Sequence, residues 1–524
     1  MNMHKKESIL ILILFAAAAF YLFSKIKFGI NIYDEGITLY GAVGVLEGHI
    51  PYRDFYYLYP PGNIYVLALI FKGFGPSILI SRMFNSIILL LILVGSYLIT
   101  KKLISDKISI LLSFFLITIL LGMDESFNVL SIPILLILLS TIFIFYYFDR
   151  KILHNLVILG ILTGLTAYFR LDFAFYLFFS ISLILCIFHY NYYMDLGYNK
   201  VLSLFKAEEY LLLYGSVCLL TIIPLIIFLL YYVPIDQLIS QFITYPTKIY
   251  PVYSYMPWSY QYFNLIPIFI YLATSLLLAS KLIKGSFCSK KDLKVSFLLF
   301  LGLTLIYYAK VRPDVGHFFP TLIISLILLS YICSEIFTII GNFTQIIIKS
   351  SNKNLFRFFI IVLMIGSLLF YSTLLFTNKG NNLTSIDLER GNGIYVSQQD
   401  DFLAAAKYIQ QNVPPYEKIF VGNNNTDDSD VNNVMFYYLS GRDSGVFYYD
   451  LEPGVVTTLP VQLEMIQELE QNNVQYIVLW NGDENPNIMG NGVMNLDYYI
   501  KSHYNLTKTF GNYSIYIIKN NIRQ

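Results

Sequence analysis

The segment Tyr33-Asp34-Glu35-Gly36 is followed by Pro51-Tyr52-Arg53-Asp54 and then by Pro60-Pro61-Gly62. These carboxylates, the arginine and the rigid turns come directly after an apolar stretch, 8–23. That stretch is the first of about eleven segments long and apolar enough to cross a bilayer. Charged groups beside a membrane are costly and are usually kept for a task. The pattern therefore predicts a bundle of membrane helices with a polar centre at its surface.

The composition indicates an integral membrane protein. Of the 524 residues, 56% are hydrophobic and only 13% are charged, and the mean hydropathy is +0.60. Soluble domains carry about a quarter charged residues. The net charge of +1 gives no electrostatic reason to expect a nucleic-acid partner.

The distribution of basic residues predicts the orientation in the membrane. The predicted spans are 8–23, 77–100, 107–122, 128–148, 153–169, 172–190, 210–233, 262–283, 294–309, 317–345 and 355–377. With the N-terminus inside, the four basic loops lie in the cytoplasm, as the positive-inside rule requires. These loops contain Lys101, Lys102 and Lys107; Arg150 and Lys151; the lysines of 281–294; and Lys349, Lys353 and Arg357. We expect a multipass protein of the plasma (inner) membrane with loops 24–76 and 232–261 and the C-terminal part outside.

The outer loops hold most of the remaining charged groups, whereas the middles of the spans are nearly free of charge. A transporter or proton pump places ionisable groups at mid-membrane depth, so this distribution favours chemistry at the outer surface. The outer groups are Asp34, Glu35, Arg53 and Asp54; Asp124 and Glu125; Arg170 and Asp172; and Arg312, Asp314 and His317.

The first outer loop, 24–76, predicts two short helices that lie along the membrane surface. Apolar residues recur at helical spacing over 37–47, with Gly48 as a stop, and 62–74 is a second candidate. Pro60-Pro61-Gly62 predicts a rigid corner. A structural alternative for Asp34 is helix capping, because Asn31 precedes it by three residues and acids favour helix N-termini.

The same stretch resembles the first extracytoplasmic loop of the GT-C class of membrane glycosyltransferases. Protein O-mannosyltransferases, lipid A aminoarabinose transferases and their bacterial and archaeal relatives are the most similar groups. The resemblance is carried by Asp34-Glu35-Gly36, Tyr40-Gly41, Gly48, Pro51-Tyr52-Arg53-Asp54-Phe55, Pro60-Pro61-Gly62, Gly75 and Arg82. It covers 30–90 by motif, 91–377 by architecture and 378–524 by general layout.

This resemblance implies a sugar donor linked to a polyprenyl phosphate, an acceptor hydroxyl and an inverting displacement at the outer surface. It implies that Asp34 is the general base. Glu35 would orient the base or the acceptor, and Asp54 is a weaker candidate.

The leaving phosphate calls for cations that supply charge-assisted hydrogen bonds. The candidates for binding substrate or phosphate are Arg53, Asp54, Arg82, Arg170, Asp172, Arg312, Asp314 and His317. The structural alternative for Arg82 and Arg170 is that they lie at the membrane interface, where their charged ends reach water. The structural alternative for Arg312 and Asp314 is that they pair with each other and close a tight loop.

We expect no metal or other cofactor. No His/Cys cluster has the spacing of a zinc site, and no glycine-rich loop indicates a nucleotide. Acidic groups from several outer loops leave Mg²⁺ or Mn²⁺ open as an option.

The polar region after about 378 predicts a small extracytoplasmic α/β domain, and residues 1–377 the membrane domain. Helices are expected at 401–411 and 461–471, buried strands at 418–422 and 474–480, and a hairpin over 504–519 that turns at Gly511-Asn512. Its role would be accessory.

Two non-enzymatic alternatives stay open. The chain could be a flippase or exporter of lipid-linked glycans, which would require polar groups along a path through the membrane. It could also be a scaffold whose C-terminal domain binds glycan of the cell envelope.

Overall fold

The computed structural model describes residues 3–123, 129–258, 264–286, 289–344, 360–373, 383–397, 401–427, 432–481 and 492–519. Asp124 and Glu125, the basic residues Lys349, Lys353 and Arg357, and the predicted domain boundary at 377/378 lie outside the described residues.

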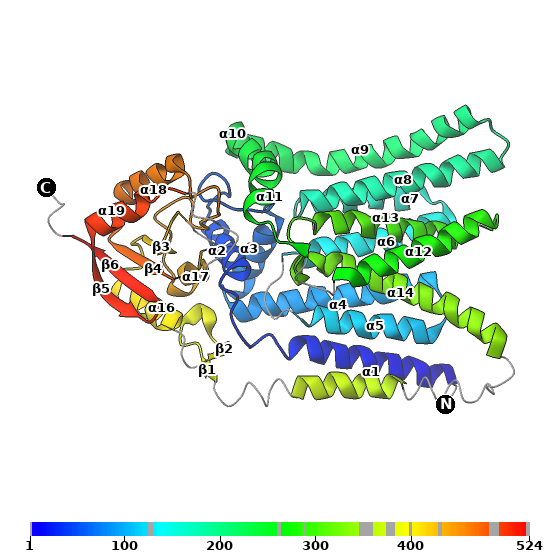
Figure 1. Ribbon diagram of the computed structural model, residues 1–524, viewed down its shortest axis with the longest axis horizontal. Coiled ribbons are helices and arrows are strands. Elements are labelled where there is room, and N and C mark those ends of the chain that lie inside the picture. The colour runs from blue at the N-terminus through cyan, green and yellow to red at the C-terminus, as the bar shows by residue number, and fades with distance from the viewer. Residues whose placement is uncertain are drawn as a thin grey trace.

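Most of the chain is a bundle of apolar helices that run side by side (Figure 1). Among the described residues, six helices are long and apolar enough to cross a membrane, and several shorter ones are equally apolar. A helix stands at every predicted span, which confirms a multipass helical membrane protein. The helices are α1 (Met3–Phe23), α4 (Ile78–Leu103), α5 (Lys107–Leu121), α6 (Ser131–Arg150), α7 (Leu153–Ala167), α8 (Leu171–Asp195), α9 (Lys200–Tyr232), α12 (Leu265–Ile283), α13 (Lys290–Tyr308), α14 (Val315–Thr344) and Ile360–Thr373.

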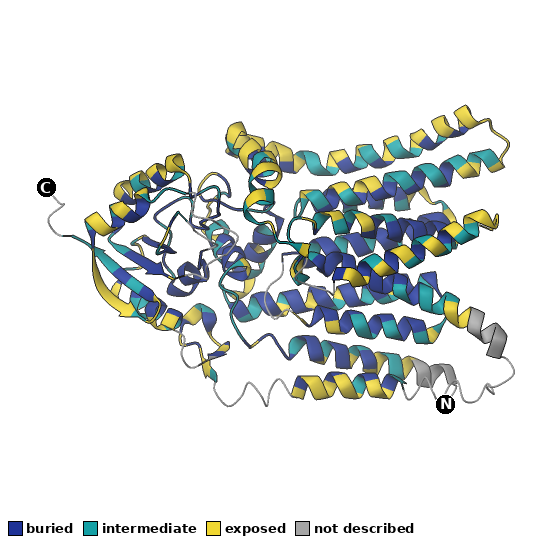
Figure 2. Ribbon diagram, in the orientation of Figure 1, coloured by how far each residue is buried: buried dark blue, intermediate teal, exposed yellow. Residues whose placement is uncertain are grey.

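The outer surface of the bundle is apolar. Figure 2 shows the buried residues concentrated in the inner helices, whereas α9 and α12 carry many exposed and half-buried residues. Leu220, Ile227, Phe269 and Leu276 on these two helices are each more than half exposed. Such an extended apolar surface is expected where lipid replaces water as the surroundings.

The two ends of the bundle carry different polar groups. At the end with the N-terminus, the Asp149 carboxylate forms ion pairs with Lys294 at 2.7 Å and with Lys102 at 3.9 Å. These two lysines belong to two of the predicted basic loops. The C-terminal domain lies at the opposite end (Figure 1).

Two helices of the first outer loop lie between the bundle and the C-terminal domain (Figure 1). They are α2 (Asp34–Leu46) and α3 (Gly62–Phe74), which confirms both predicted helices. Helix α2 begins three residues earlier than predicted, because Asp34 and Glu35 form its first turn, where acidic side chains favour the helix dipole. A second outer segment follows α9 and contains α10 (Ile235–Ile239), the π-helix η1 (Ser240–Ile249) and α11 (Tyr250–Tyr253).

The C-terminal domain has a four-stranded sheet in the order β3 (Ile419–Asn423), β4 (Tyr476–Trp480), β6 (Tyr513–Ile518) and β5 (Tyr504–Phe510). Strands β3 and β4 are parallel, and the other pairs are antiparallel. The predicted helices correspond to α16 (Asp401–Asn412) and α18 (Leu459–Gln471). The α/β prediction is therefore confirmed. The sequence patterns missed α17 (Met435–Ser440), α19 (Asn495–His503), the 3-10 turn η4 (Glu389–Gly391) and the small ladder of β1 (Leu383–Ser385) with β2 (Tyr395–Ser397).

The C-terminal domain docks directly on the first outer loop. Met435 donates its backbone N–H to the carbonyl of Ile32 at 3.3 Å, and Ser444 donates its own to the Tyr40 hydroxyl at 2.8 Å. A Cβ atom at position 36 would lie 2.5 Å from the backbone nitrogen of Met435. Gly36 is therefore required because α17 packs backbone against backbone on α2.

We expect Gly36→Ala to destabilise the protein by about 2 kcal/mol, the usual cost of overpacking a tight contact. Thermal unfolding of the purified protein in detergent would show this as a lower midpoint. Gly44→Ala is the matched control on the same helix, because its Cβ would make only ordinary contacts, with Phe55 at 3.4 Å and His49 at 3.7 Å. Equal midpoints for the two variants would contradict the close approach of the domains.

Candidate functional site

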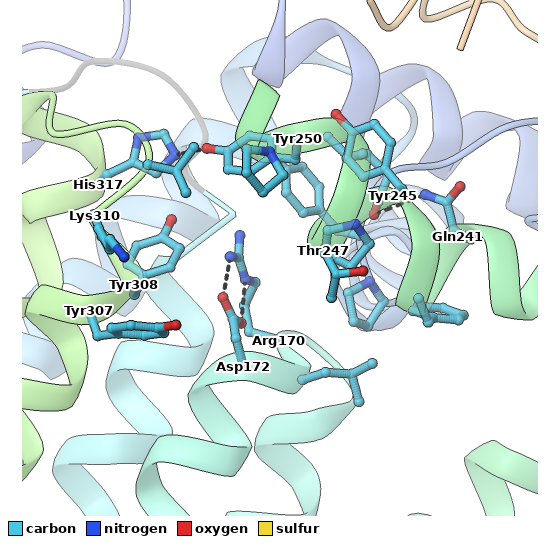
Figure 3. Close-up of a pocket in the computed structure, with 18 of the residues that line it drawn as sticks. Arg170, Asp172, Gln241, Tyr245, Thr247, Tyr250, Tyr307, Tyr308, Lys310 and His317 are labelled. Atoms are coloured by element: carbon cyan, nitrogen blue, oxygen red, sulfur yellow. Dashed lines mark hydrogen bonds and ion pairs between the residues drawn. The ribbon is translucent and has the colours of Figure 1, made fainter. Parts of the chain in front are cut away.

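A cavity of about 740 Å³ opens where the bundle, the first outer loop and the 235–253 segment meet. Figure 3 shows the Arg170 guanidinium inside it, with Tyr308 and His317 on one side and Tyr245 and Gln241 on the other. The side chains are mostly aromatic or apolar with a few polar groups, which is typical of a ligand site. The further lining residues are Leu58, Tyr59, Pro60, Leu171, Asp172, Tyr176, Phe242, Pro246, Thr247, Tyr250, Pro251, Tyr255, Tyr307, Lys310 and Val311.

Arg170 is the N-cap residue of α8, and Asp172 lies in the first turn of that helix. Two parallel hydrogen bonds join them, from Arg170 Nε to Asp172 Oδ1 at 3.0 Å and from Nη2 to Oδ2 at 2.7 Å. The guanidinium also lies over the rings of Tyr59 and Tyr308, 5.3 and 5.0 Å from their centres. This arrangement holds the Arg170 guanidinium at the cavity.

The Pro60-Pro61-Gly62 corner fixes the turn before Arg170. Gly62 donates its N–H to the carbonyl of Tyr168 at 2.7 Å, and a Cβ at position 62 would lie 2.5 Å from the same oxygen. The glycine thus lets the start of α3 touch the chain two residues before Arg170.

Arg312, Asp314 and His317 form one connected group beside the cavity. Arg312 Nε donates to Asp314 Oδ2 at 2.8 Å, and His317 Nδ1 lies 2.8 Å from Asp314 Oδ1. The other ring nitrogen of His317 lies 2.9 Å from the Tyr250 hydroxyl. Burial alone would raise the pKa of Asp314, but the hydrogen bonds from His317 and the charge of Arg312 lower it to about 2. Asp314 therefore stays ionised and holds the Arg312 guanidinium and the His317 ring in place.

Asp34 is exposed at the start of α2 and lies close enough for its charge to act on Arg312 and Tyr59, although it is not among the described residues that line the cavity. Burial and the charge of Asp34 raise the pKa of Tyr59, which lines the cavity. Burial alone would lower the pKa of Arg312, but the charges of Asp314 and Asp34 contribute to raising it. The N-cap position is Tyr33, so Asp34 does not cap the helix, but it lies in the first turn as an acid that favours the helix dipole, which is the second part of the structural alternative.

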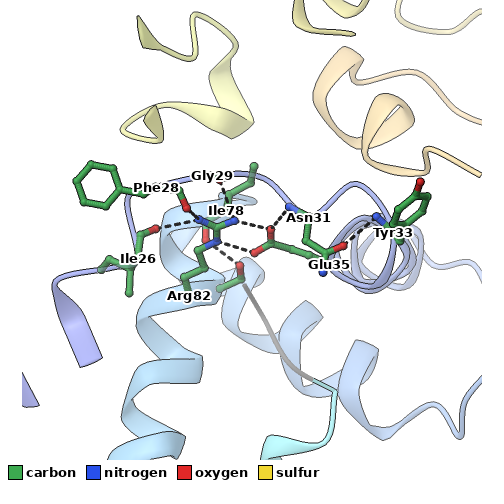
Figure 4. Close-up of polar contacts among 9 residues, drawn as sticks. Ile26, Phe28, Gly29, Asn31, Tyr33, Glu35, Ile78 and Arg82 are labelled. Atoms are coloured by element: carbon green, nitrogen blue, oxygen red, sulfur yellow. Dashed lines mark hydrogen bonds and ion pairs between the residues drawn. The ribbon is translucent and has the colours of Figure 1, made fainter. Parts of the chain in front are cut away.

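Glu35, which follows Asp34 in the chain, forms a buried ion pair with Arg82 (Figure 4). Arg82 Nε and Nη2 each donate to a Glu35 carboxylate oxygen at 2.7 Å, and the two side chains are 1% and 0% exposed. The guanidinium also binds the carbonyls of Ile26, Phe28 and Gly29 at 3.0–3.2 Å. The alternative that Arg82 reaches interfacial water is therefore wrong, since it binds the chain that leads from α1 into α2.

Arg53 and Asp54 lie in a tight turn and are not among the residues that line the cavity within the described chain. They are exposed and pair with each other at 2.6 Å. The Asp54 carboxylate also accepts from the Ile50 N–H at 2.7 Å. Their contacts as described maintain the turn.

Sequence reasoning missed several polar groups of the site. Gln241 and Tyr245 come from the 235–253 segment, and Glu452 of the C-terminal domain accepts a hydrogen bond of 2.6 Å from the Tyr245 hydroxyl. Nearby Asp450 is fully buried. No local pattern marks these two acids, because only the docking of the C-terminal domain brings them to the first outer loop.

Within the described chain, no group of three or more His, Cys, Asp or Glu side chains has the geometry to hold a metal ion. The cations at the site are instead arginine and lysine side chains, which suit an anionic ligand.

No family model matches the sequence. No curated protein matches it either.

Solved structures identify the fold. The oligosaccharyltransferase of Archaeoglobus fulgidus, tethered with an acceptor peptide that contains an NVT sequon, aligns with a TM-score of 0.50 at 12% identity. That alignment covers 90% of this chain and 68% of the other. ArnT from Cupriavidus metallidurans bound to undecaprenyl phosphate aligns with a TM-score of 0.52 at 10% identity, over 98% of both chains. Apo ArnT gives 0.50 at 12% identity, again over 98% of both.

Both neighbours are GT-C glycosyltransferases. The chain is thus an integral membrane protein with the GT-C fold, and the class indicated by the 30–90 motif is confirmed at the level of fold.

We expect Arg82→Met to destabilise the protein by about 3–5 kcal/mol, because it leaves the Glu35 carboxylate buried without its partner. The double variant Glu35→Gln/Arg82→Met should lose less than the sum of the two single variants. Denaturant unfolding in detergent would measure both.

Arg53→Gln is the control for this experiment, since it breaks an exposed pair of the same loop and should change little. An Arg82→Met variant as stable as Arg53→Gln would contradict a structural role for the buried pair.

Proposed function

We propose that this chain is a membrane glycosyltransferase that transfers a sugar from a polyprenyl phosphate to a hydroxyl acceptor. The observation that carries this proposal is the exposed Asp34 carboxylate, whose charge acts on Arg312 and on Tyr59 of the cavity that Arg170, Lys310 and His317 line. A base beside a group of cations is the arrangement that transfer away from a phosphate requires.

Arg170, Lys310 and Arg312 would bind the phosphate of the donor. Asp172 and Asp314 would keep the two guanidinium groups in place, as their hydrogen bonds with Arg170 and Arg312 suggest. His317, oriented by Asp314 and Tyr250, would supply a further hydrogen bond. The undecaprenyl phosphate in the ArnT structure supports a lipid phosphate as the donor's carrier.

Asp34 would act as the general base for the acceptor. The acceptor oxygen forms a bond to the anomeric carbon, the bond from that carbon to the phosphate oxygen breaks, and Asp34 takes the acceptor's proton. The electron pair of the broken bond leaves on the lipid phosphate, where the cations stabilise it. A single displacement inverts the anomeric carbon. Glu35, paired with Arg82, would orient the helix turn that carries Asp34.

The reaction would take place at the extracytoplasmic face of the plasma membrane. The basic loops around Asp149 would lie in the cytoplasm with the N-terminus, and the C-terminal domain at the other end would lie outside. This orientation places a lipid-borne donor, rather than a cytoplasmic nucleotide sugar, within reach of the cavity. Membrane lipids would surround the apolar helices.

We expect Asp34→Asn to lower the transfer rate by about 100- to 10,000-fold, the usual contribution of a general base, while the donor still binds. The purified protein in lipid would be tested with labelled polyprenyl-phosphate sugars and an acceptor extract of cell envelope. The unfolding midpoint must match that of the unchanged protein. Equal rates would remove Asp34 as the base, and no turnover with any donor would favour the flippase or scaffold alternatives.

We expect Lys310→Gln to raise the KM for the donor about tenfold or more, since a hydrogen bond to a charged group contributes about 1.5–3 kcal/mol. Lys206→Gln is the control, because Lys206 pairs with Glu209 on the exposed surface of α9. Competition by undecaprenyl phosphate would be measured in parallel. If Lys310→Gln and Lys206→Gln bind donor equally, Lys310 does not contact the phosphate.

A further inference from the structure

The 235–253 segment forms one wall of the cavity (Figure 3). It consists of the short helices α10 and α11 on either side of the ten-residue π-helix η1, which contains Pro246. π-Helices are rare and usually extend over a single turn, and a proline removes one backbone hydrogen-bond donor. Ile243 and Lys248 of η1 are exposed. The position of this wall therefore depends on contacts with other parts of the molecule.

Two side chains anchor the segment to the membrane domain. The Gln241 amide donates to the carbonyls of Tyr57 and Leu58 in the first outer loop, at 2.9 and 3.2 Å. The Tyr250 hydroxyl lies 2.9 Å from His317 Nε2 in the first turn of α14. These contacts fix the segment near the middle of η1 and at the start of α11.

A third anchor comes from the C-terminal domain. The Tyr245 hydroxyl donates to Glu452 Oε2 at 2.6 Å, a length typical of a hydroxyl bound to a carboxylate. Both residues are 6% exposed, so water hardly competes for this bond. Two positions further along, Gly454 lies against the segment, because a Cβ there would clash with the Tyr253 ring and lie 2.8 Å from Ile249. The C-terminal domain thus holds the segment from the side of Glu452.

Tyr245 stands between two cavities. A second, smaller cavity of about 50 Å³ lies among the first outer loop, the 235–253 segment and the C-terminal domain. Tyr245 and Gln241 line both this cavity and the main one. A core side chain is normally fixed by close packing on all sides, whereas Tyr245 has open space beside it in both cavities. Its hydrogen bond to Glu452 therefore determines where the ring stands.

We propose that Glu452 is a positioning residue of the donor site, because its hydrogen bond holds the Tyr245 ring, and with it η1, against the main cavity. Without this bond the ring turns toward the smaller cavity, and the main cavity widens on the side opposite His317. The donor then loses contacts along this wall, while the transfer step at Asp34 is unchanged. The inference rests on the proposed function for the identity of the ligand, and it makes the C-terminal domain part of the donor site rather than accessory.

The kinetic test uses the full-length protein in lipid with a labelled polyprenyl-phosphate sugar. Glu452→Met removes the acceptor at similar size, and Tyr245→Phe removes the hydroxyl but keeps the ring. We expect each to raise the KM for the donor about tenfold, the loss of one hydrogen bond to a charged group, with kcat unchanged. The double variant should equal either single one, because both remove the same bond. Glu452→Gln, whose amide oxygen still accepts, should restore most of the affinity.

Limited trypsin digestion reports the position of the segment without requiring turnover. Lys248 is exposed and is the only lysine or arginine in 235–253, so cleavage after it measures release of the segment. We expect cleavage at Lys248 to be about tenfold faster in Glu452→Met and in Tyr245→Phe, because cleavage follows the population of the released state. Undecaprenyl phosphate should slow this cleavage in the unchanged protein. Tyr245→Phe keeps the test decisive if Glu452→Met fails to fold.

Asp497→Asn is the matched control, since Asp497 is a buried carboxyl of the same domain that accepts the Thr426 N–H at 3.2 Å. It should change neither the KM for the donor nor the cleavage at Lys248. Equal cleavage of Tyr245→Phe and the unchanged protein would overturn the positioning role, and so would KM effects that multiply in the double variant. Faster cleavage in the variants, with no donor turnover and no protection by undecaprenyl phosphate, would support the anchor and overturn the proposed function itself.

Discussion

The buried pair of Glu35 and Arg82 is the interaction on which the site depends. Arg82 stands in the second turn of a membrane helix, α4, and binds both the first turn of α2 and the carbonyls of the chain that leaves α1. Successive residues of a helix point about 100° apart. Because Glu35 is fixed toward Arg82, the side chain of its neighbour Asp34 points in a different direction. The buried position of Glu35 thus leaves the Asp34 carboxylate exposed.

The remaining motif residues of the first loop act mainly through backbone contacts. Gly36 admits α17 of the C-terminal domain, and Gly62 admits the chain before Arg170. A loop made of two surface helices and a proline corner thus connects three separate parts of the molecule at fixed positions. This explains why a motif that looks catalytic over 33–62 contains so many residues, among them Arg53 and Asp54, whose described contacts are structural.

The sequence was sufficient to predict the features that depend on local pattern. Membrane spans follow from length and hydropathy, because lipid imposes the same demand on every helix. The four strands of the C-terminal sheet and helices α16 and α18 follow from periodicity and turn residues. It was not sufficient to predict the pairing of Glu35 with Arg82, forty-seven positions apart, or the arrival of Asp450 beside Asp34. Those contacts arise from tertiary packing, and no spacing in the chain marks them.

Asp314 and Asp450 show how surroundings shift the pKa of one residue type in opposite directions. Hydrogen bonds from His317 and the charge of Arg312 lower the pKa of Asp314, whereas burial and the charges of Glu452 and Asp34 raise the pKa of Asp450. The charge of Asp34 thus acts both on Arg312 of the membrane domain and on Asp450 of the C-terminal domain. Because Asp450 approaches the first outer loop only when the C-terminal domain docks, that docking is part of the electrostatic surroundings of Asp34.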